Sequence, residues 1–95
     1  MKRAVIINKK DNVASLLSDV LENETVHAQL GNDILIYTIK ELIRFGHKFA
    51  VRPIEKGENV IKYGEVIGRA SIDIDIGCHA HVHNIESLRG RGDLS

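Results

Sequence analysis

Glycines recur at close intervals through the middle of the chain, and this spacing constrains the fold more than any other feature of the sequence. Gly46, Gly57, Gly64 and Gly68 separate segments of only a few residues each. Segments of this length fit β-strands, and glycine is favoured in the tight turns that join strands. A dense series of glycine turns between short strands is typical of all-β domains. We therefore expect a mainly β fold.

Several segments carry the composition of strands. Residues 25–30 and 34–39 are rich in β-branched side chains and flank a turn signal at Gly31. Residues 3–8 and 47–52 indicate two further strands. In residues 71–76 isoleucine alternates with aspartate, which predicts a strand with one apolar and one acidic face.

One segment shows helical periodicity instead. The apolar residues in 13–21 recur at the spacing of an amphipathic helix, and Asp11 or Asn12 suits the N-cap position before it. We therefore expect one short helix near the N-terminus. Its apolar positions are Val13, Leu16, Leu17, Val20 and Leu21.

The 95 residues make one domain. A chain of this size buries roughly 60–65% of the surface that its unfolded form exposes, which leaves little room for a self-contained active site. A module that completes a site with a partner fits this size better. We expect residues 1–88 to form the domain and residues 89–95, with two glycines and no periodicity, to form a flexible tail. No internal repeat is visible.

Charge and composition exclude several classes of function. Thirteen Lys and Arg balance thirteen Asp and Glu, which argues against a nucleic-acid binder that neutralises phosphates. The apolar runs are far shorter than the ~20 residues needed to cross a bilayer, and no secretory signal is expected. The single cysteine, Cys78, has no internal disulfide partner, which fits a reducing interior. The expected location is the cytoplasm, with no nucleic-acid or membrane partner.

Three alternating histidines mark the most informative segment. If residues 77–84 are extended, His79, His81 and His83 project from one face. Imidazoles in this arrangement can share a divalent metal or line an anionic pocket. Partly solvated strand residues are the alternative, and the spacing does not single out zinc. We favour a functional role because three histidines alternate and Asn84 follows them.

A second candidate pair follows Gly46. Lys48 suits neutralisation of a substrate carboxylate and His47 suits proton transfer. The alternative, a solvent-exposed lysine and a structural histidine in the turn, accounts for these two residues equally well. Cys78 suits a thiolate nucleophile or a metal ligand, but free cysteines are commonly buried, and we favour that interpretation.

An ordered string of these residues closely resembles the SAF domain of the altronate dehydratase family. Galactarate dehydratase and the small subunit of sulfolactate sulfo-lyase carry the same domain. The resemblance runs from about residue 1 to the end of the chain. Its positions are Gly46-His47-Lys48, then Ile54, Gly57, Val60, Lys62-Tyr63-Gly64, Ile67 and Gly68, then Ile76-Gly77 and His81-Val82-His83-Asn84.

The resemblance implies a β-clip-like fold and a function. In this family the SAF domain accompanies a much larger catalytic domain, fused or separate, and the enzyme eliminates water or sulfite from a hydroxy acid. The chain is therefore expected to be a small subunit that completes or lids the active site of a large catalytic subunit and is inactive alone. The alternative is a non-catalytic sugar-acid-binding or assembly module. Exposed edges around the glycine turns also allow a homo-oligomer.

Site roles also follow from the resemblance, position by position. Iron(II) or manganese(II) is the expected cofactor, held by these histidines or by the partner subunit. Abstraction of a proton alpha to a carboxylate requires a base and a stabilising cation, which these residue types supply. The expected catalytic residues are His47, Lys48, His81 and His83, and the expected substrate contacts are Lys48 and Asn84. The expected metal ligands are His81 and His83, to which the alternation of the histidines, rather than the resemblance, adds His79.

Overall fold

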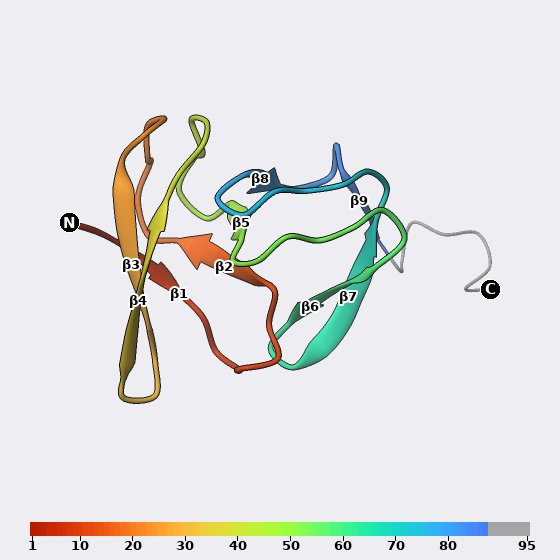
Figure 1. Cartoon of the computed structure of the whole chain (residues 1–95), viewed down its shortest axis with the longest axis horizontal. Coiled ribbons are helices and arrows are strands. Elements are labelled where there is room, and N and C mark those ends of the chain that lie inside the picture. Colours follow the sequence, from red (N-terminus) through yellow and green to blue (C-terminus); the bar gives the residue numbers. More distant parts are fainter. Residues whose placement is uncertain (88–95) are drawn as a thin grey trace.

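Two β-sheets make up the chain in a computed structural model that describes residues 1–87 (Figure 1). The predicted tail at residues 89–95 lies outside the described residues. The larger sheet has the order β4-β3-β1-β2-β5-β8, and the smaller has the order β6-β7-β9. The strands are β1 (Lys2–Val5), β2 (Val13–Leu16), β3 (Thr25–Leu30), β4 (Asp33–Thr38), β5 (Lys48–Ala50), β6 (Asn59–Lys62), β7 (Glu65–Ala70), β8 (His79–Ala80) and β9 (Ile85–Ser87).

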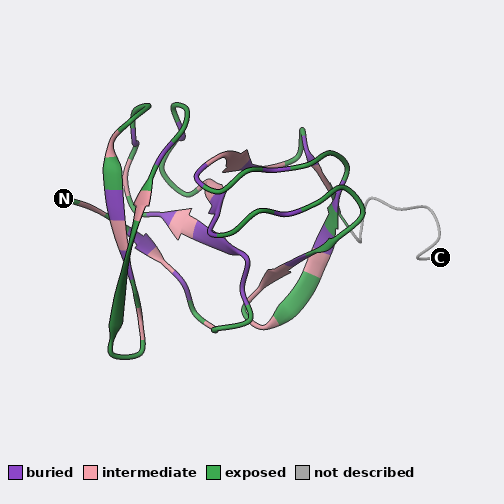
Figure 2. Ribbon diagram, viewed as in Figure 1, coloured by how far each residue is buried: buried purple, intermediate pink, exposed green. Residues whose placement is uncertain are grey.

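The β3–β4 hairpin confirms the local strand predictions. Its two strands pair antiparallel from Thr25 with Thr38 to Leu30 with Asp33, on either side of the turn at Gly31. β3 also pairs with β1, in parallel, while the other pairs in both sheets are antiparallel. The hairpin extends away from the body of the molecule, and its tip is exposed (Figures 1 and 2).

The expected N-terminal helix is wrong, since no helix occurs anywhere in residues 1–87. Val13–Leu16 instead forms β2, which lies between β1 and β5 in the middle of the larger sheet. A central strand is buried on both faces, so its apolar residues need not alternate and can mimic helical spacing. Of the three remaining apolar positions of the pattern, Leu17 and Leu21 are exposed and Val20 is buried. The described residues therefore contain no helix long and apolar enough to cross a membrane.

The strand expected at residues 71–76 is also absent. Only Ile74 forms a β-bridge, with Ile54, and the chain bends on both sides of it. Ile74 is buried whereas Ile72 and Ile76 are exposed, so the three isoleucines do not share a buried face. Alternation over so short a segment does not define a strand when a single residue carries all of its pairing.

A local structure recurs four times along the chain. A buried Val or Ile forms a bridge, and three residues later a residue with positive φ turns the backbone. Val20 bridges Ile43, and Ile54 bridges Ile74, so the four copies form two pairs. The turning residues are Asn23, Gly46, Gly57 and Gly77, in the same order along the chain.

The hydrophobic core is divided between these two pairs. One cluster of buried residues contains Val20, Ile43 and Phe49, and the other contains Ile54 and Ile74. Buried positions concentrate in the strands between the hairpin and the smaller sheet (Figure 2). β2 and β5 contribute to both clusters and so join the two halves of the molecule.

Asn12 does not cap a helix but connects β2 to the smaller sheet. Its side-chain amide donates to the Asn59 carbonyl at 2.9 Å and accepts from the Ile61 N–H at 2.7 Å. Asn12 is buried, so the groups that it satisfies lose access to water. The adjacent Asp11 carboxylate accepts from the Gly64 N–H at 2.8 Å.

We expect Asn12→Ala to lower the free energy of unfolding by about 1–3 kcal/mol, because it leaves the hydrogen-bonding groups of β6 unsatisfied. Urea unfolding followed by circular dichroism measures this loss. Lys9→Ala, an exposed change in the preceding turn, is the control and should stay within about 0.5 kcal/mol of the unaltered chain. An Asn12→Ala variant as stable as the control would contradict the assigned role.

Candidate histidine site

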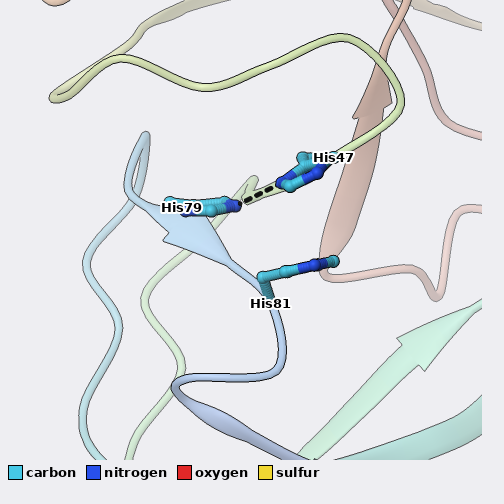
Figure 3. A group of neighbouring side chains, drawn as sticks. All are labelled: His47, His79 and His81. Atoms are coloured by element: carbon cyan, nitrogen blue, oxygen red, sulfur yellow. Dashed lines mark hydrogen bonds between the residues drawn. The ribbon is translucent and has the colours of Figure 1, made fainter.

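Three imidazole rings converge at the junction of β5 and β8 (Figure 3). His47 Nδ1 lies 2.9 Å from His79 Nε2, and these nitrogens share a hydrogen bond. The His47 and His81 rings are stacked with their centroids 4.1 Å apart. One ligand nitrogen from each of the three residues lies within 4.8 Å of the others. The arrangement can share protons among three imidazoles or offer three nitrogen donors to one cation.

Pairing between β5 and β8 brings together residues that are distant in sequence. Lys48 pairs with Ala80 and Phe49 with His79, so His47, directly before β5, lies next to the end of β8. His47 follows the Gly46 turn, and its carbonyl accepts a hydrogen bond from the Leu16 N–H of β2. The position of His47 is therefore fixed by β2 on one side and β8 on the other.

Asn84 holds the two histidines of the C-terminal segment in place. Its side-chain oxygen accepts from the His81 N–H at 2.8 Å, and its side-chain nitrogen donates to the His79 carbonyl at 2.7 Å. Asn84 is only 4% exposed. Because both ends of its amide bind backbone, Asn84 positions the histidines in this structure. Its expected contact with substrate stays a prediction.

His83 lies beside the histidine triad, which consists of His47, His79 and His81, but it belongs to a different local structure. β8 comprises only His79 and Ala80, and the chain turns at residues 82–84, so the extended segment is shorter than expected. The exposed His83 ring has its centroid 4.9 Å from that of His79. The structure thus joins His79 and His81 to His47, a grouping that the sequence spacing does not reveal, and places His83 at its margin.

The electrostatic surroundings favour neutral imidazoles. Burial, followed by the neighbouring histidines, lowers the pKa of His79, with a smaller opposing effect from Glu41. Burial, then His47, Lys48 and His83, lowers the pKa of His81. Neutral imidazole is the form that binds metals. Within residues 1–87, His81 Nδ1 is a buried polar atom with no hydrogen-bond partner.

These residues fit a first-row divalent metal. Imidazole nitrogen is a common ligand for iron, zinc and copper, and a buried nitrogen without a partner is costly unless something binds it. The same His47 and His79 nitrogens that share a proton can bind a cation instead. The fit rests on this donor set and on the unpartnered Nδ1 of His81.

We expect the folded chain to lose stability as the pH falls below about 7. The pKa values of His79 and His81 are lowered in the folded state, so the unfolded chain binds more protons below the ordinary histidine pKa of about 6.5. This contribution to the free energy of unfolding is complete above that pH. It decreases as the pH falls toward the lower pKa values of His79 and His81 in the folded chain. Urea unfolding at several pH values between about 7.5 and 5.5 measures it. In His81→Asn the dependence should be smaller; an unchanged dependence would contradict the explanation.

Lys48, the next residue after His47, is half-buried and lines a cavity of about 250 Å³ that also contains His81. The thiol of Cys78, the other candidate for chemistry, is not part of this cavity. Cys78 is partly buried against the second core cluster. Burial, with Glu41 and Asp75, raises the pKa of the Cys78 thiol, which keeps it protonated and disfavours a nucleophilic thiolate. The Asp73 carboxylate accepts from the Lys56 N–H at 2.7 Å and so joins the Ile54 turn to the Ile74 turn.

Comparison with known proteins identifies the family. The family model of the altronate/galactarate dehydratase SAF domain matches residues 2–88. The chain therefore belongs to this family, which confirms the resemblance found in the sequence. Relatives include altronate dehydratase of Bacillus subtilis, 42% identical over 87 residues, and altronate dehydratase of Escherichia coli, 45% identical over 78 residues.

The extent of these matches differs between two groups of relatives. The Bacillus subtilis match covers 92% of this chain and 17% of the dehydratase, and the Escherichia coli match covers 82% and 15%. The (2R)-sulfolactate sulfo-lyase subunit alpha of Chromohalobacter salexigens is 44% identical over 55 residues, 58% of each chain. The chain thus spans less than one fifth of the altronate dehydratases and more than half of a lyase subunit. Its relatives are dehydratases and lyases.

Proposed function

We propose that this chain is the small SAF-domain subunit of a hydroxy-acid lyase and that it completes the active site of a separate large catalytic subunit. Family membership and relatives named as dehydratases and as a lyase subunit support the proposal. The small fraction of the dehydratases that the chain matches supports a large partner. The observations that carry the proposed site are the convergence of His47, His79 and His81 and the buried Nδ1 of His81, which has no hydrogen-bond partner within residues 1–87.

In the proposed site His47, His79 and His81 hold iron(II) or manganese(II). The bound metal supplies a positive charge that polarises the substrate carboxylate and favours loss of the adjacent proton. Asn84 keeps the His79 and His81 backbone in position through its two hydrogen bonds. His83 is exposed beside His79, so it is the histidine placed to exchange a proton with a substrate entering from outside. Lys48 is assigned to the substrate carboxylate.

Isothermal calorimetry of the full chain with manganese(II), and anaerobically with iron(II), tests the proposed site. We expect His81→Ala and His47→Ala to weaken binding by about 10- to 100-fold or more, because each removes one of three ligands. His27→Ala is the matched control, since His27 lies in β3 and is not part of the cluster. If both variants bind manganese(II) as tightly as the control, the three histidines are not a metal site.

The lyase role is tested with the large subunit. We expect the reconstituted enzyme to eliminate water or sulfite from altronate, galactarate or sulfolactate, and His83→Ala to lower kcat by about 10²- to 10⁴-fold, the range for a general acid or base. Full activity with His47→Ala, His81→Ala and His83→Ala would favour a binding or assembly module without catalytic groups. Circular dichroism of each variant checks that it remains folded.

A further inference from the structure

A backbone N–H at the start of β8 lies outside the pairing between β5 and β8. β8 contains only two residues and forms an edge of the larger sheet, so β5 pairs with it on one side alone. The His79 N–H donates instead to the Glu41 carboxylate, with 3.1 Å between the nitrogen and Oε2. A hydrogen bond to a charged acceptor is stronger than one between neutral groups. Glu41 therefore binds the backbone of a histidine of the triad directly.

Glu41 belongs to the same stretch of chain as His47. It lies in the bend between β4 and β5, and His47 follows in the same connection. The residue before Glu41 makes a second contact to the same place, since the Lys40 N–H binds the Gly77 carbonyl at 3.0 Å. Two hydrogen bonds thus join this bend to the chain around His79, one through the backbone and one through the Glu41 side chain. They fix His79 relative to the segment that carries its hydrogen-bond partner, His47.

The backbone of His79 is held from both sides by side chains. Glu41 binds its N–H, and the Asn84 side chain donates to its carbonyl at 2.7 Å. Because the Cα–Cβ bond lies between these two groups, fixing both limits the direction in which the imidazole can point. His79 Nε2 is 2.9 Å from His47 Nδ1, and a hydrogen bond of this length tolerates little rotation of the His79 backbone. The ion pairs within residues 1–87 do not include Glu41, so its carboxylate serves this contact.

We propose that Glu41 is a positioning residue of the histidine triad: by holding the His79 N–H, it orients the His79 imidazole toward His47 and so raises the affinity of the site for metal. The inference deepens the proposed function and rests on it for the metal. Glu41 acts through His79 and is not itself a ligand. Within residues 1–87, the ligand atoms that lie within 4.8 Å of one another belong to the three histidines and not to Glu41.

Manganese(II) calorimetry of the full chain tests this role with three variants. Glu41→Ala removes the acceptor and should weaken binding about tenfold, the lower end of the range for groups that orient metal ligands. Glu41→Gln loses the charge but keeps an oxygen that accepts from the His79 N–H, so its affinity should stay within about threefold of the unaltered chain. Asp75→Asn is the control for charge, since it removes one exposed carboxylate four residues before His79 and leaves the Glu41 contact intact.

Proton NMR of the metal-free chain supplies a measurement that does not depend on metal. The proton shared by the His47 and His79 nitrogens should give an imidazole N–H resonance protected from exchange with water. We expect this resonance to be lost in Glu41→Ala and retained in Glu41→Gln and Asp75→Asn. The amide spectra of the same samples show that each variant is folded.

The outcomes separate the inference from the proposed function. Glu41→Ala that binds manganese(II) as tightly as the unaltered chain, or that keeps the shared proton, would overturn the positioning role. Glu41→Gln as weak as Glu41→Ala would overturn it too, because the charge and not the hydrogen bond would then matter. If the unaltered chain binds no manganese(II) but Glu41→Ala still loses the shared proton, the metal site fails and the orienting of His79 by Glu41 stands.

Discussion

Replacement of Gly77 by alanine should destabilise the chain by roughly 3 kcal/mol or more, one of the largest effects expected of any single substitution here. Gly77 has a φ of +85°, which disfavours any residue with a Cβ atom. A Cβ at this position would also collide with the Thr38 carbonyl oxygen. That oxygen is backbone and cannot move easily, since Lys40 N–H binds the Gly77 carbonyl and Gly77 N–H binds the Ala50 carbonyl.

Gly57→Ala is the matched control for this prediction. Gly57 occupies the equivalent place in another copy of the turn and has a φ of +89°, but a Cβ there meets nothing within 4 Å. Gly57→Ala should therefore lower the free energy of unfolding by only about 1–2 kcal/mol, the cost of placing a residue with a Cβ atom at positive φ. Urea unfolding of both variants gives the comparison. Equal losses would mean that the close approach between Gly77 and Thr38 does not limit stability.

The second large effect concerns His47 and combines stability with metal binding. In two of the four turns, a glutamate four residues after the bridging residue closes its own turn. Glu24 accepts from the Leu21 N–H at 2.7 Å, and Glu58 accepts from the Glu55 N–H at 2.7 Å. His47 occupies the same place after Ile43 but directs its ring to His79. Two of the turns thus have a glutamate that stabilises the turn at this place, whereas the Ile43 turn has a histidine that contributes to the site instead.

We expect His47→Gln to raise the free energy of unfolding of the metal-free chain by about 0.5–1 kcal/mol, because the amide oxygen accepts from the Arg44 N–H as the glutamates do in their turns. With manganese(II) at about 100 times its dissociation constant, the unaltered chain should gain about 2.7 kcal/mol, a rise in Tm of roughly 10–20 °C. The variant should gain much less. The order of the two melting temperatures therefore reverses when metal is added.

Thermal melts of both chains, with and without manganese(II), measure this reversal. Leu21→Gln provides a control, because it replaces an exposed residue of another turn and leaves the triad intact. Its response to manganese(II) should match that of the unaltered chain. A His47→Gln variant that gains as much from metal as this control would exclude His47 as a ligand.

The parts of the fold that form between residues close together in the sequence could be predicted from the sequence. β3 and β4 were predictable because their β-branched runs flank a turn, and pairing across a short turn involves only local residues. β2 was not, because its burial on both faces depends on β1 and β5, which the local pattern does not report. The four turns share only a spacing between two positions, which is too little to appear as a sequence repeat.

The site shows the same division between local and distant information. The alternation of His79 and His81 identified two of its members, and the Gly46 turn, which the family resemblance also includes, identified His47 as a separate candidate. Nothing local could show that His47 and His79, 32 residues apart, share a hydrogen bond. The backbone contacts of Asn84 were equally hidden, because an asparagine after histidines suits a ligand contact as well as a turn.

His47 follows the Ile43 turn, in the first core cluster, whereas His79 follows the Ile74 turn, in the second. A ligand that holds both imidazoles therefore cross-links the two halves and closes a loop between residues separated by 32 positions. A permanent link of that span lowers the entropy of the unfolded chain by an amount worth about 3–4 kcal/mol, as a disulfide does. Since the single cysteine of the chain cannot form an internal disulfide, a ligand bound by the histidine triad would act as a reversible cross-link in its place. Loss of the ligand would then remove this stabilisation as well as the chemistry that the ligand supplies.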